Sequence, residues 1–244
     1  YTSDTHWGCC IRCTQSLLAN FCIRFYTRSH AIFLNSLGCE PFAAFDDVPT
    51  APLSIHSICH ELENLGVPVG VWTTVTQIAP VVGRLLMAKR IPVYTPPGCI
   101  VSKVELRKLF KPKTPLLSLL PVMCGMDEFD MRCSEFLSFC YSAESGLGAV
   151  IGVEANALYL VGERKGKLLY FDPHTTLDSA EGSNRTSVLF KASLQALKTN
   201  TINPSLMVGF MWWNVEEMER DLGVIAGMEF SPLSIVEEDE FLVM

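Results

Sequence analysis

Hydrophobic residues recur at three- and four-residue steps near the start of the chain, as they do along one face of a helix. A period of 3.6 residues predicts an amphipathic helix there. The residues of this row are Cys10, Cys13, Leu17, Phe21 and Phe25. An irregular section at 35–52, rich in glycine, proline, aspartate and phenylalanine, follows the helix and predicts a loop or the boundary of an insertion.

The middle of the chain alternates between helical and strand patterns. The helical period predicts helices at 56–65, 76–88, 102–110, 131–142 and 215–222. Short apolar runs between turn-forming residues predict strands at 66–72, 115–124, 148–153, 158–161, 167–171 and 206–213. Residues 162–166 are expected to join two of these strands as an antiparallel hairpin. The pattern therefore predicts an α+β chain whose first helix precedes an antiparallel sheet.

A cysteine stands directly at the start of the first predicted helix. The run SDTHWGC at residues 3–9 places Cys9 in the first helical turn. The unpaired backbone N–H groups and the positive end of the helix dipole favour the thiolate form there. A neighbouring imidazolium would favour the thiolate further. Cys9 is therefore a candidate nucleophile.

A second motif follows the predicted strand at 167–171. Residues i and i+2 of a strand project to the same side, so Asp172 and His174 are expected to face one another. Pro173 holds Asp172 extended and removes a backbone donor, which suits a strand end. A cysteine protease needs an imidazole that takes the thiol proton and returns it to the leaving amine, and a polar group that orients the imidazole. Each motif alone also fits a structural role, as a buried cysteine or a turn.

The two motifs resemble those of the autophagins, cysteine endopeptidases that process ubiquitin-like modifiers of autophagy. The motifs are TSDTHWGCCIRCTQ at residues 2–15 and FDPHTT at 171–176. Further similar blocks, in the family's order, are SIH at 54–56, GVW at 70–72, PLLSLLPV at 115–122, GLG at 146–148 and PSLMVGF at 204–210. The resemblance implies a papain-like α+β fold, with a helix-borne nucleophile packed on an antiparallel sheet and a small inserted subdomain at about 35–100. It also implies that Cys9, Asp172 and His174 are catalytic.

The resemblance further implies an enzyme that cleaves after the C-terminal glycine of a ubiquitin-like autophagy modifier, for processing and for delipidation. Trp72 is expected to contact the glycine end of this substrate in the cleft, with a place in the core as the alternative. Phe241, in a flexible acidic tail at 229–244, is expected to dock on the modifier. The expected partners are the modifier and, transiently, membranes that carry its lipidated form. The alternatives are a papain-like protease or deubiquitinating enzyme with another substrate, and a non-catalytic pseudoenzyme that binds the modifier.

Several positions depart from the family's pattern. His6 stands where the family has glycine, and it places a titratable ring close to the nucleophile. The family's Gly-Gly-Lys-Pro loop over the cleft reads GVEA at 152–155, and a substrate-contacting arginine falls at Met123. Tyr1 does not match the family's oxyanion tyrosine, which lies further upstream. Either the sequence covers only part of a longer protein or this donor is missing, and in the second case the backbone N–H of Cys9 is the remaining candidate donor.

Composition narrows the class of protein. With 244 residues, 49% of them hydrophobic, the chain is long enough for a single catalytic domain over 1–244, with or without a small insertion. A formal net charge of -7 argues against nucleic acid as a partner. Ten cysteines in a chain of this size, with no signal-like start and no apolar run of membrane-spanning length, favour reduced thiols and a cytoplasmic location. The resemblance implies no cofactor.

Two clusters have both a structural and a functional interpretation. Cys10 and Cys13 form C-x-x-C, while His56 and His60 form H-x3-H, so a zinc site is conceivable. The gap between the pairs is far longer than in a zinc finger and both pairs lie on apolar helix faces, so core packing is favoured and no metal is expected. The basic cluster at 103–113 fits a solvated helix face, or docking on anionic lipid or an acidic partner.

Overall fold

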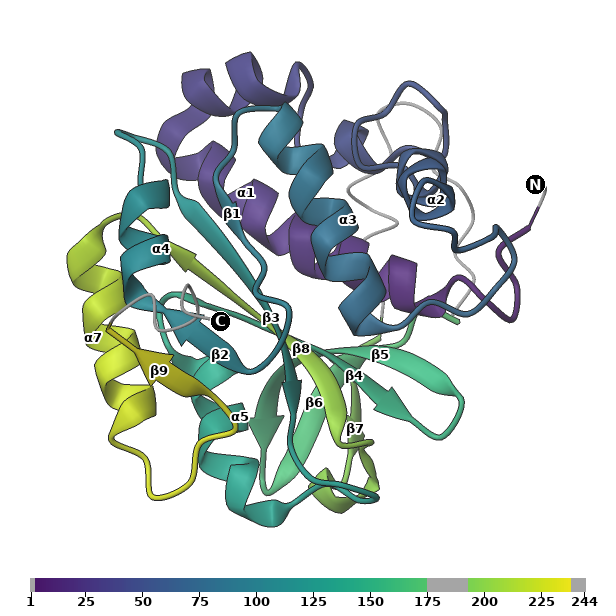
Figure 1. Ribbon diagram of the computed structural model, residues 1–244. Coiled ribbons are helices and arrows are strands. Elements are labelled where there is room, and N and C mark those ends of the chain that lie inside the picture. Colours follow the sequence, from purple (N-terminus) through teal and green to yellow (C-terminus); the bar gives the residue numbers. More distant parts are fainter. Residues whose placement is uncertain (1–2, 175–192, 238–244) are drawn as a thin grey trace.

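The computed structural model describes residues 3–174 and 193–237, and within them the chain forms one large sheet between two layers of helices (Figure 1). The strands of this sheet are β1 (Val93–Tyr94), β3 (Leu116–Met123), β4 (Gly146–Val153), β5 (Asn156–Arg164), β6 (Lys167–Phe171), β7 (Gln195–Leu197) and β8 (Ser205–Trp212). Their order is β1-β3-β8-β4-β5-β6-β7, antiparallel except for the pair β1 and β3. The predicted α+β class and antiparallel sheet are confirmed.

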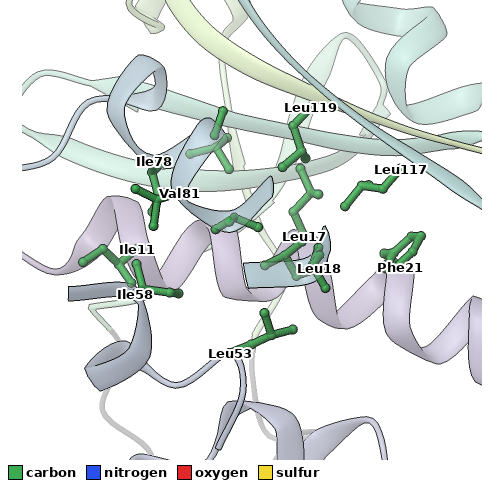
Figure 2. Close-up of a cluster of buried hydrophobic side chains, with 14 of the residues drawn as sticks. Ile11, Leu17, Leu18, Phe21, Leu53, Ile58, Ile78, Val81, Leu117 and Leu119 are labelled. Carbon is green, nitrogen blue, oxygen red and sulfur yellow. The ribbon is translucent and has the colours of Figure 1, made fainter. Parts of the chain in front are cut away.

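Three helices lie on one side of the sheet: α1 (Cys9–Leu37), α2 (Ile55–Glu63) and α3 (Val75–Ala88) (Figure 1). Their buried side chains form a single cluster with those of the facing strands. Figure 2 shows Leu17 of α1, Val81 of α3 and Leu119 of β3 within this cluster. A Cβ at Gly209 of β8 would lie 3.0 Å from Leu17 Cδ2, so the glycine lets α1 pack closely on the sheet. The helix that begins with Cys9 is thereby held firmly against the strands.

The other side of the sheet is covered by α4 (Lys103–Leu109), α5 (Ser134–Ser142) and α7 (Val215–Ala226). Alternate side chains of β8 enter the two layers, with Met207 and Met211 in the α1 cluster, and Phe210 and Trp212 in the other. A strand buried on both faces needs apolar residues throughout. This explains why residues 206–213 form a continuous hydrophobic run in the sequence.

The strand predicted at 66–72 is wrong, because these residues form the loop between α2 and α3. Gly66 and Gly70 adopt positive φ angles of 79° and 90°, which turn the chain out of an extended path. The predicted strands and helices elsewhere are present, with ends shifted by a few residues. Four short strands were missed: β1, β7, β2 (Ile100–Ser102) and β9 (Ser234–Val236), none of which is long enough to show a period.

The segment predicted as a flexible acidic tail is ordered in its first half. Strand β9 pairs in parallel with β2, and Glu237 pairs with Lys103 and Arg107 of α4. The flexible tail predicted at 229–244 thus contains a paired strand, which no local pattern indicates because its partners lie 130 and more residues away in the chain. Phe241 lies outside the described residues. The division into a catalytic domain and an inserted subdomain at about 35–100 stays a prediction.

The basic cluster of α4 is largely matched by acidic side chains. Lys103 Nζ lies 3.3 Å from Glu219 Oε2, and the guanidinium of Arg107 also forms an ion pair with Glu219. Glu237 accepts hydrogen bonds from the same two basic residues, and these bonds lower the pKa of its carboxyl group. An ion-paired helix face thus describes Lys103 and Arg107 better than a free anion-binding patch.

In the part of the chain that the structure describes, we find no helix that combines the length and the apolar character needed to cross a bilayer.

Candidate active site

Helix α1 begins at Cys9, with Gly8 as its N-cap, so the thiol lies in the first helical turn as predicted. Cys9 is half-buried, whereas the side chain of the adjacent Cys10 is only 3% exposed. Burial, and then the charge of Cys9, raise the pKa of the Cys10 thiol to about 12. Of the two neighbouring thiols, Cys9 is therefore the one that solvent and a substrate can reach.

A tight turn leads into Cys9. The carbonyl oxygen of Asp4 accepts hydrogen bonds from the backbone N–H groups of Trp7 (3.3 Å) and Gly8 (2.9 Å). A Cβ at Gly8 would lie 2.6 Å from Asp4 Cβ, so this position needs glycine. His6 has a φ of 72°, in the left-handed region that glycine adopts without strain. This backbone conformation accounts for the glycine of the autophagin pattern at the position of His6.

We predict that His6→Gly raises the free energy of unfolding by about 0.5–1 kcal/mol. Relief of the left-handed conformation gains about 1–2 kcal/mol, and the greater freedom of glycine in the unfolded chain offsets part of it. Lys165, with a φ of 55° in the hairpin turn between β5 and β6, offers a parallel substitution, Lys165→Gly. Urea denaturation measures the free energy of unfolding of both variants. A loss of stability at His6 but a gain at Lys165 would mean that the histidine ring makes a stabilising contact.

Arg12 connects the turn before Cys9 to a loop 35 residues further along the chain. Its Nε lies 2.6 Å from Asp4 Oδ2, and its two terminal nitrogens each lie 2.8 Å from one oxygen of Asp47. Gln15, which accepts from Arg12 at 3.2 Å, donates to the carbonyl of Leu53. The guanidinium fixes the turn and the loop to α1. Sequence reasoning missed Arg12 because nothing local indicates a partner as distant as Asp47.

Arg12→Met is predicted to destabilise the fold by about 1–2 kcal/mol, since it removes a bidentate pair and a second carboxylate contact that are partly screened by solvent. We also expect any cleavage by Cys9 to slow about tenfold, because the turn that orients its backbone N–H loses its support. Arg84→Met is the matched control: Arg84 Nε lies 3.7 Å from Glu61 and its side chain is 44% exposed. It should change stability by less than about 0.5 kcal/mol. Equal effects of the two substitutions would contradict a positioning role.

Asp172 and His174 face one another directly after β6, as the strand geometry predicted. His174 Nδ1 lies 2.7 Å from Asp172 Oδ1, which also accepts a hydrogen bond of 2.9 Å from the backbone N–H of His174. The carboxylate thus holds both the ring and the backbone of the histidine. With Nδ1 bound in this way, Nε2 remains to exchange a proton. The histidine side chain is 42% exposed and so can meet a substrate.

Two observations place this pair near the start of α1. Phe171, the residue before Asp172, packs against the same buried cluster as Cys9. The pKa of the Cys13 thiol is raised well above its ordinary value, by burial first and then by the charges of Cys10, Cys9 and Asp172. Cys13 lies one helical turn after Cys9 on the same side of α1. Asp172 therefore lies close enough to α1 for its charge to act on Cys13, although the two motifs are more than 160 residues apart in the sequence.

Trp72 lines a pocket of about 180 Å³ beside the start of α1. The other walls come from Cys10, the residues Thr73–Val75, the β4–β5 hairpin and Asn203. Trp72 is 42% exposed. The prediction that Trp72 belongs to a cleft is thus supported by its position, whereas the core alternative is wrong.

The segment that resembles the family's cleft loop is a tight hairpin in this chain. Val153 pairs with Asn156 in the ladder, so only Glu154 and Ala155 form the turn. Asn203 fixes it, because its backbone N–H donates to Gly152 O at 2.7 Å and its side chain donates to Glu154 O at 3.2 Å. Sequence reasoning missed Asn203, which precedes Pro204 in what reads as an ordinary turn.

All ten cysteines lie within the described ranges and are free thiols. Cys10 and Cys13 of the C-x-x-C motif are buried in the α1 cluster. Across residues 3–174 and 193–237, no group of three or more His, Cys, Asp or Glu side chains is arranged to hold a metal ion.

Comparison with known proteins gives a consistent match over almost the whole chain. The sequence model of the peptidase C54 catalytic domain matches residues 1–222. The cysteine protease ATG4 of Candida albicans is 26% identical over 89% of this chain and 50% of its own length. The probable cysteine protease atg4 of Schizosaccharomyces pombe is 26% identical, over 99% of this chain and 77% of its own length. The cysteine protease ATG4B of Xenopus laevis is 26% identical over 89% of this chain and 66% of its own length. The chain thus spans about half the length of the Candida albicans relative.

Proposed function

The chain belongs to the peptidase C54 family, and on this premise we propose that it is a cysteine endopeptidase that cleaves after the C-terminal glycine of a ubiquitin-like autophagy modifier. The observation that carries the proposal is the 2.7 Å contact between His174 Nδ1 and Asp172 Oδ1, which leaves the other ring nitrogen available. The position of Cys9 at the start of α1 supports it. The relatives named as cysteine proteases support the same chemistry.

The proposed reaction uses Cys9 as nucleophile and His174 as proton carrier. Nε2 of His174 takes the thiol proton, and the Cys9 sulfur attacks the carbonyl carbon of the glycine. The developing oxyanion accepts a hydrogen bond from the Cys9 backbone N–H at the start of α1. His174 then protonates the leaving amine, and a thioester forms. A water molecule, deprotonated by His174, hydrolyses the thioester and releases the free glycine carboxylate.

Asp172 orients the imidazole and stabilises the imidazolium that forms in each step. The same sequence of steps applies whether the leaving amine belongs to a peptide or to a lipid, since only the leaving group differs. Release of a modifier from a lipid amine is therefore part of the proposal. The docking role of Phe241 and the cytoplasmic location stay predictions.

We infer that the preference for glycine arises in the pocket beside Cys10. Trp72 and the hairpin that Asn203 fixes both line this pocket, and in the proposed complex they confine the last residue of the substrate. A site that accepts only an unbranched chain selects glycine by exclusion, while the folded part of the modifier binds outside.

The second candidate function is a pseudoenzyme that binds the modifier without cleaving it. It rests on His6 and on the altered cleft loop, which both depart from the family's pattern. His6, however, reproduces the left-handed turn, and the thiol of Cys9 remains accessible. These observations favour the enzyme.

The experiment is incubation of the chain with purified modifiers that carry a short C-terminal extension. Mass spectrometry should find one new C-terminus, at the glycine, for an autophagy modifier and none for ubiquitin. Cleavage of ubiquitin alone would support a deubiquitinating enzyme. Binding of the modifier without cleavage, and without labelling of Cys9 by a thiol-reactive modifier probe, would identify a pseudoenzyme.

We predict that Trp72→Ala lowers the catalytic constant by about ten- to a hundredfold, with little change in affinity, because a small misplacement of the scissile bond is costly. Steady-state kinetics on one purified modifier measures both constants. Trp72→Phe serves as the control, since it retains an aromatic wall and should keep most of the rate. An unchanged catalytic constant for Trp72→Ala would show that this ring does not position the substrate.

A further inference from the structure

The loop that joins α2 to α3 (Figure 1) carries several large apolar side chains that are exposed. Leu65, Val71 and Trp72 are 45%, 49% and 42% exposed. Residues 64–83 contain no charged side chain at all. Single exposed apolar residues are ordinary, but three within eight positions of an uncharged surface loop indicate a contact surface.

The loop has a defined shape. Val67 and Val69 point inward and pack against the α1 cluster. The backbone is held by hydrogen bonds from Val67 N to Leu62 O (3.0 Å) and from Val71 N to Pro68 O (3.4 Å). The outward orientation of the other apolar side chains is therefore fixed by the fold, and their contact with water is not relieved by packing within the loop.

We propose that this loop docks shallowly on the surface of an electrically neutral phospholipid bilayer, with Leu65, Val71 and Trp72 at the boundary between headgroups and acyl chains. Tryptophan suits this boundary, because its ring is apolar and its N–H is polar. An apolar loop that enters the interface gains affinity in proportion to the apolar area it buries.

The charges around the loop determine which bilayer it fits. The sequence has no lysine or arginine between Arg28 and Arg84, so the loop offers no cation to anionic headgroups. Glu61 and Glu63, at the end of α2, are the nearest charged residues in the chain, and Arg84 Nε lies 3.7 Å from Glu61, so these three residues together carry one net negative charge. Negative charge beside the loop disfavours anionic lipids, so docking depends on apolar contact and is insensitive to salt.

Docking also orients the pocket. Trp72 belongs both to the exposed loop and to the lining of the pocket that includes Cys10, so a docked loop brings this pocket close to the membrane surface. An amide bond between a glycine and a lipid amine lies at that depth. This consequence for a lipid-linked substrate rests on the proposed function, whereas the docking itself does not.

The first experiment is flotation of the chain with phosphatidylcholine vesicles that carry no modifier. The parent should float with the vesicles, equally at low and high salt. The double variant Leu65→Glu with Val71→Asp should bind about tenfold more weakly, because carboxylates are strongly disfavoured at the acyl boundary. Val224→Asp is the matched control: Val224 is 46% exposed on α7, across the sheet from the loop, and its substitution should not change binding.

The second experiment measures how deeply the side chain of Trp72 enters the bilayer. Vesicles with brominated acyl chains should quench part of the parent's tryptophan fluorescence, and Trp72→Phe should remove that quenched part. Absence of flotation, equal losses in the loop and control variants, or binding only to anionic vesicles at low salt would each overturn the docking proposal. A modifier-dependent interaction of the loop in the absence of vesicles, without flotation, would assign the surface to the protein substrate instead.

Activity separates this proposal from the proposed function. Leu65→Glu should leave cleavage of a soluble extended modifier unchanged and should slow release of a modifier from vesicles. Vesicle binding without any cleavage by the parent would overturn the proposed function and leave the docking intact. Cleavage of the soluble substrate without vesicle binding would overturn the docking proposal and leave the proposed function intact.

Discussion

Cys9→Ala is expected to abolish cleavage, with a loss of more than about 10⁴-fold, while the chain stays folded and still binds the modifier. The substitution removes the only sulfur that can form the thioester in the proposed reaction. It costs little stability, because Cys9 is half-buried at the first position of α1. Cleavage of a C-terminally extended modifier, with circular dichroism for the fold and a pull-down for binding, tests the three statements together.

Cys10→Ala provides the matched control, because it removes the neighbouring thiol from the same helical turn. Cys10 is buried and its thiol has a pKa of about 12, so it remains protonated at neutral pH and out of reach of a substrate. The variant should keep most of the activity and lose at most about 1–2 kcal/mol of stability from the packing it gives up. An inactive Cys10 variant beside an active Cys9 variant would reverse the assignment.

His174→Ala is expected to lower the catalytic constant by about 10³- to 10⁴-fold or more, because every proposed step moves a proton through the imidazole. The side chain is 42% exposed, so its loss should hardly change stability. Measurements at several pH values should also show a weaker pH dependence than in the parent. Equal activity of variant and parent would remove the histidine from the mechanism.

Asp172→Asn is expected to cost less than His174→Ala. Asp172 moves no proton, and an asparagine oxygen in the same place still accepts from the backbone N–H and the ring of His174. What is lost is the negative charge that stabilises the imidazolium. A larger loss for Asp172→Asn than for His174→Ala would mean that the carboxylate does more than orient the ring.

The local sequence pattern was sufficient to predict those features that depend only on residues close together in the chain. The helical period of the first segment predicted α1, and the alternation of a strand predicted that Asp172 and His174 share one side. The hydrophobic runs at 115–124 and 206–213 predicted strands, and the structure has strands there that are buried over almost their whole length. Each of these features is set by backbone geometry over a few residues, so the sequence alone contains it.

Predictions from local pattern failed where the conformation of a segment depends on a partner far away in the sequence. The run at 66–72 has the composition of a strand, but its glycines turn it and no strand lies beside it among the described residues, so it remains a loop. Glu237 reads as part of an acidic tail, yet Lys103 and Arg107 hold it in place. Short strands such as β2 and β9 exist only because they pair with one another.

The sequence by itself determined the family resemblance, the α+β class and the residues proposed for the chemistry, because these depend on motifs and on local periodicity. Only the tertiary structure decided that Arg12 fixes the turn before Cys9, that Trp72 is exposed beside Cys10, and that an apolar loop faces outward next to the pocket. These features join residues tens to more than a hundred positions apart. Their contacts exist only once the sheet and its two helical layers have assembled, and no local pattern records which distant side chains will then meet.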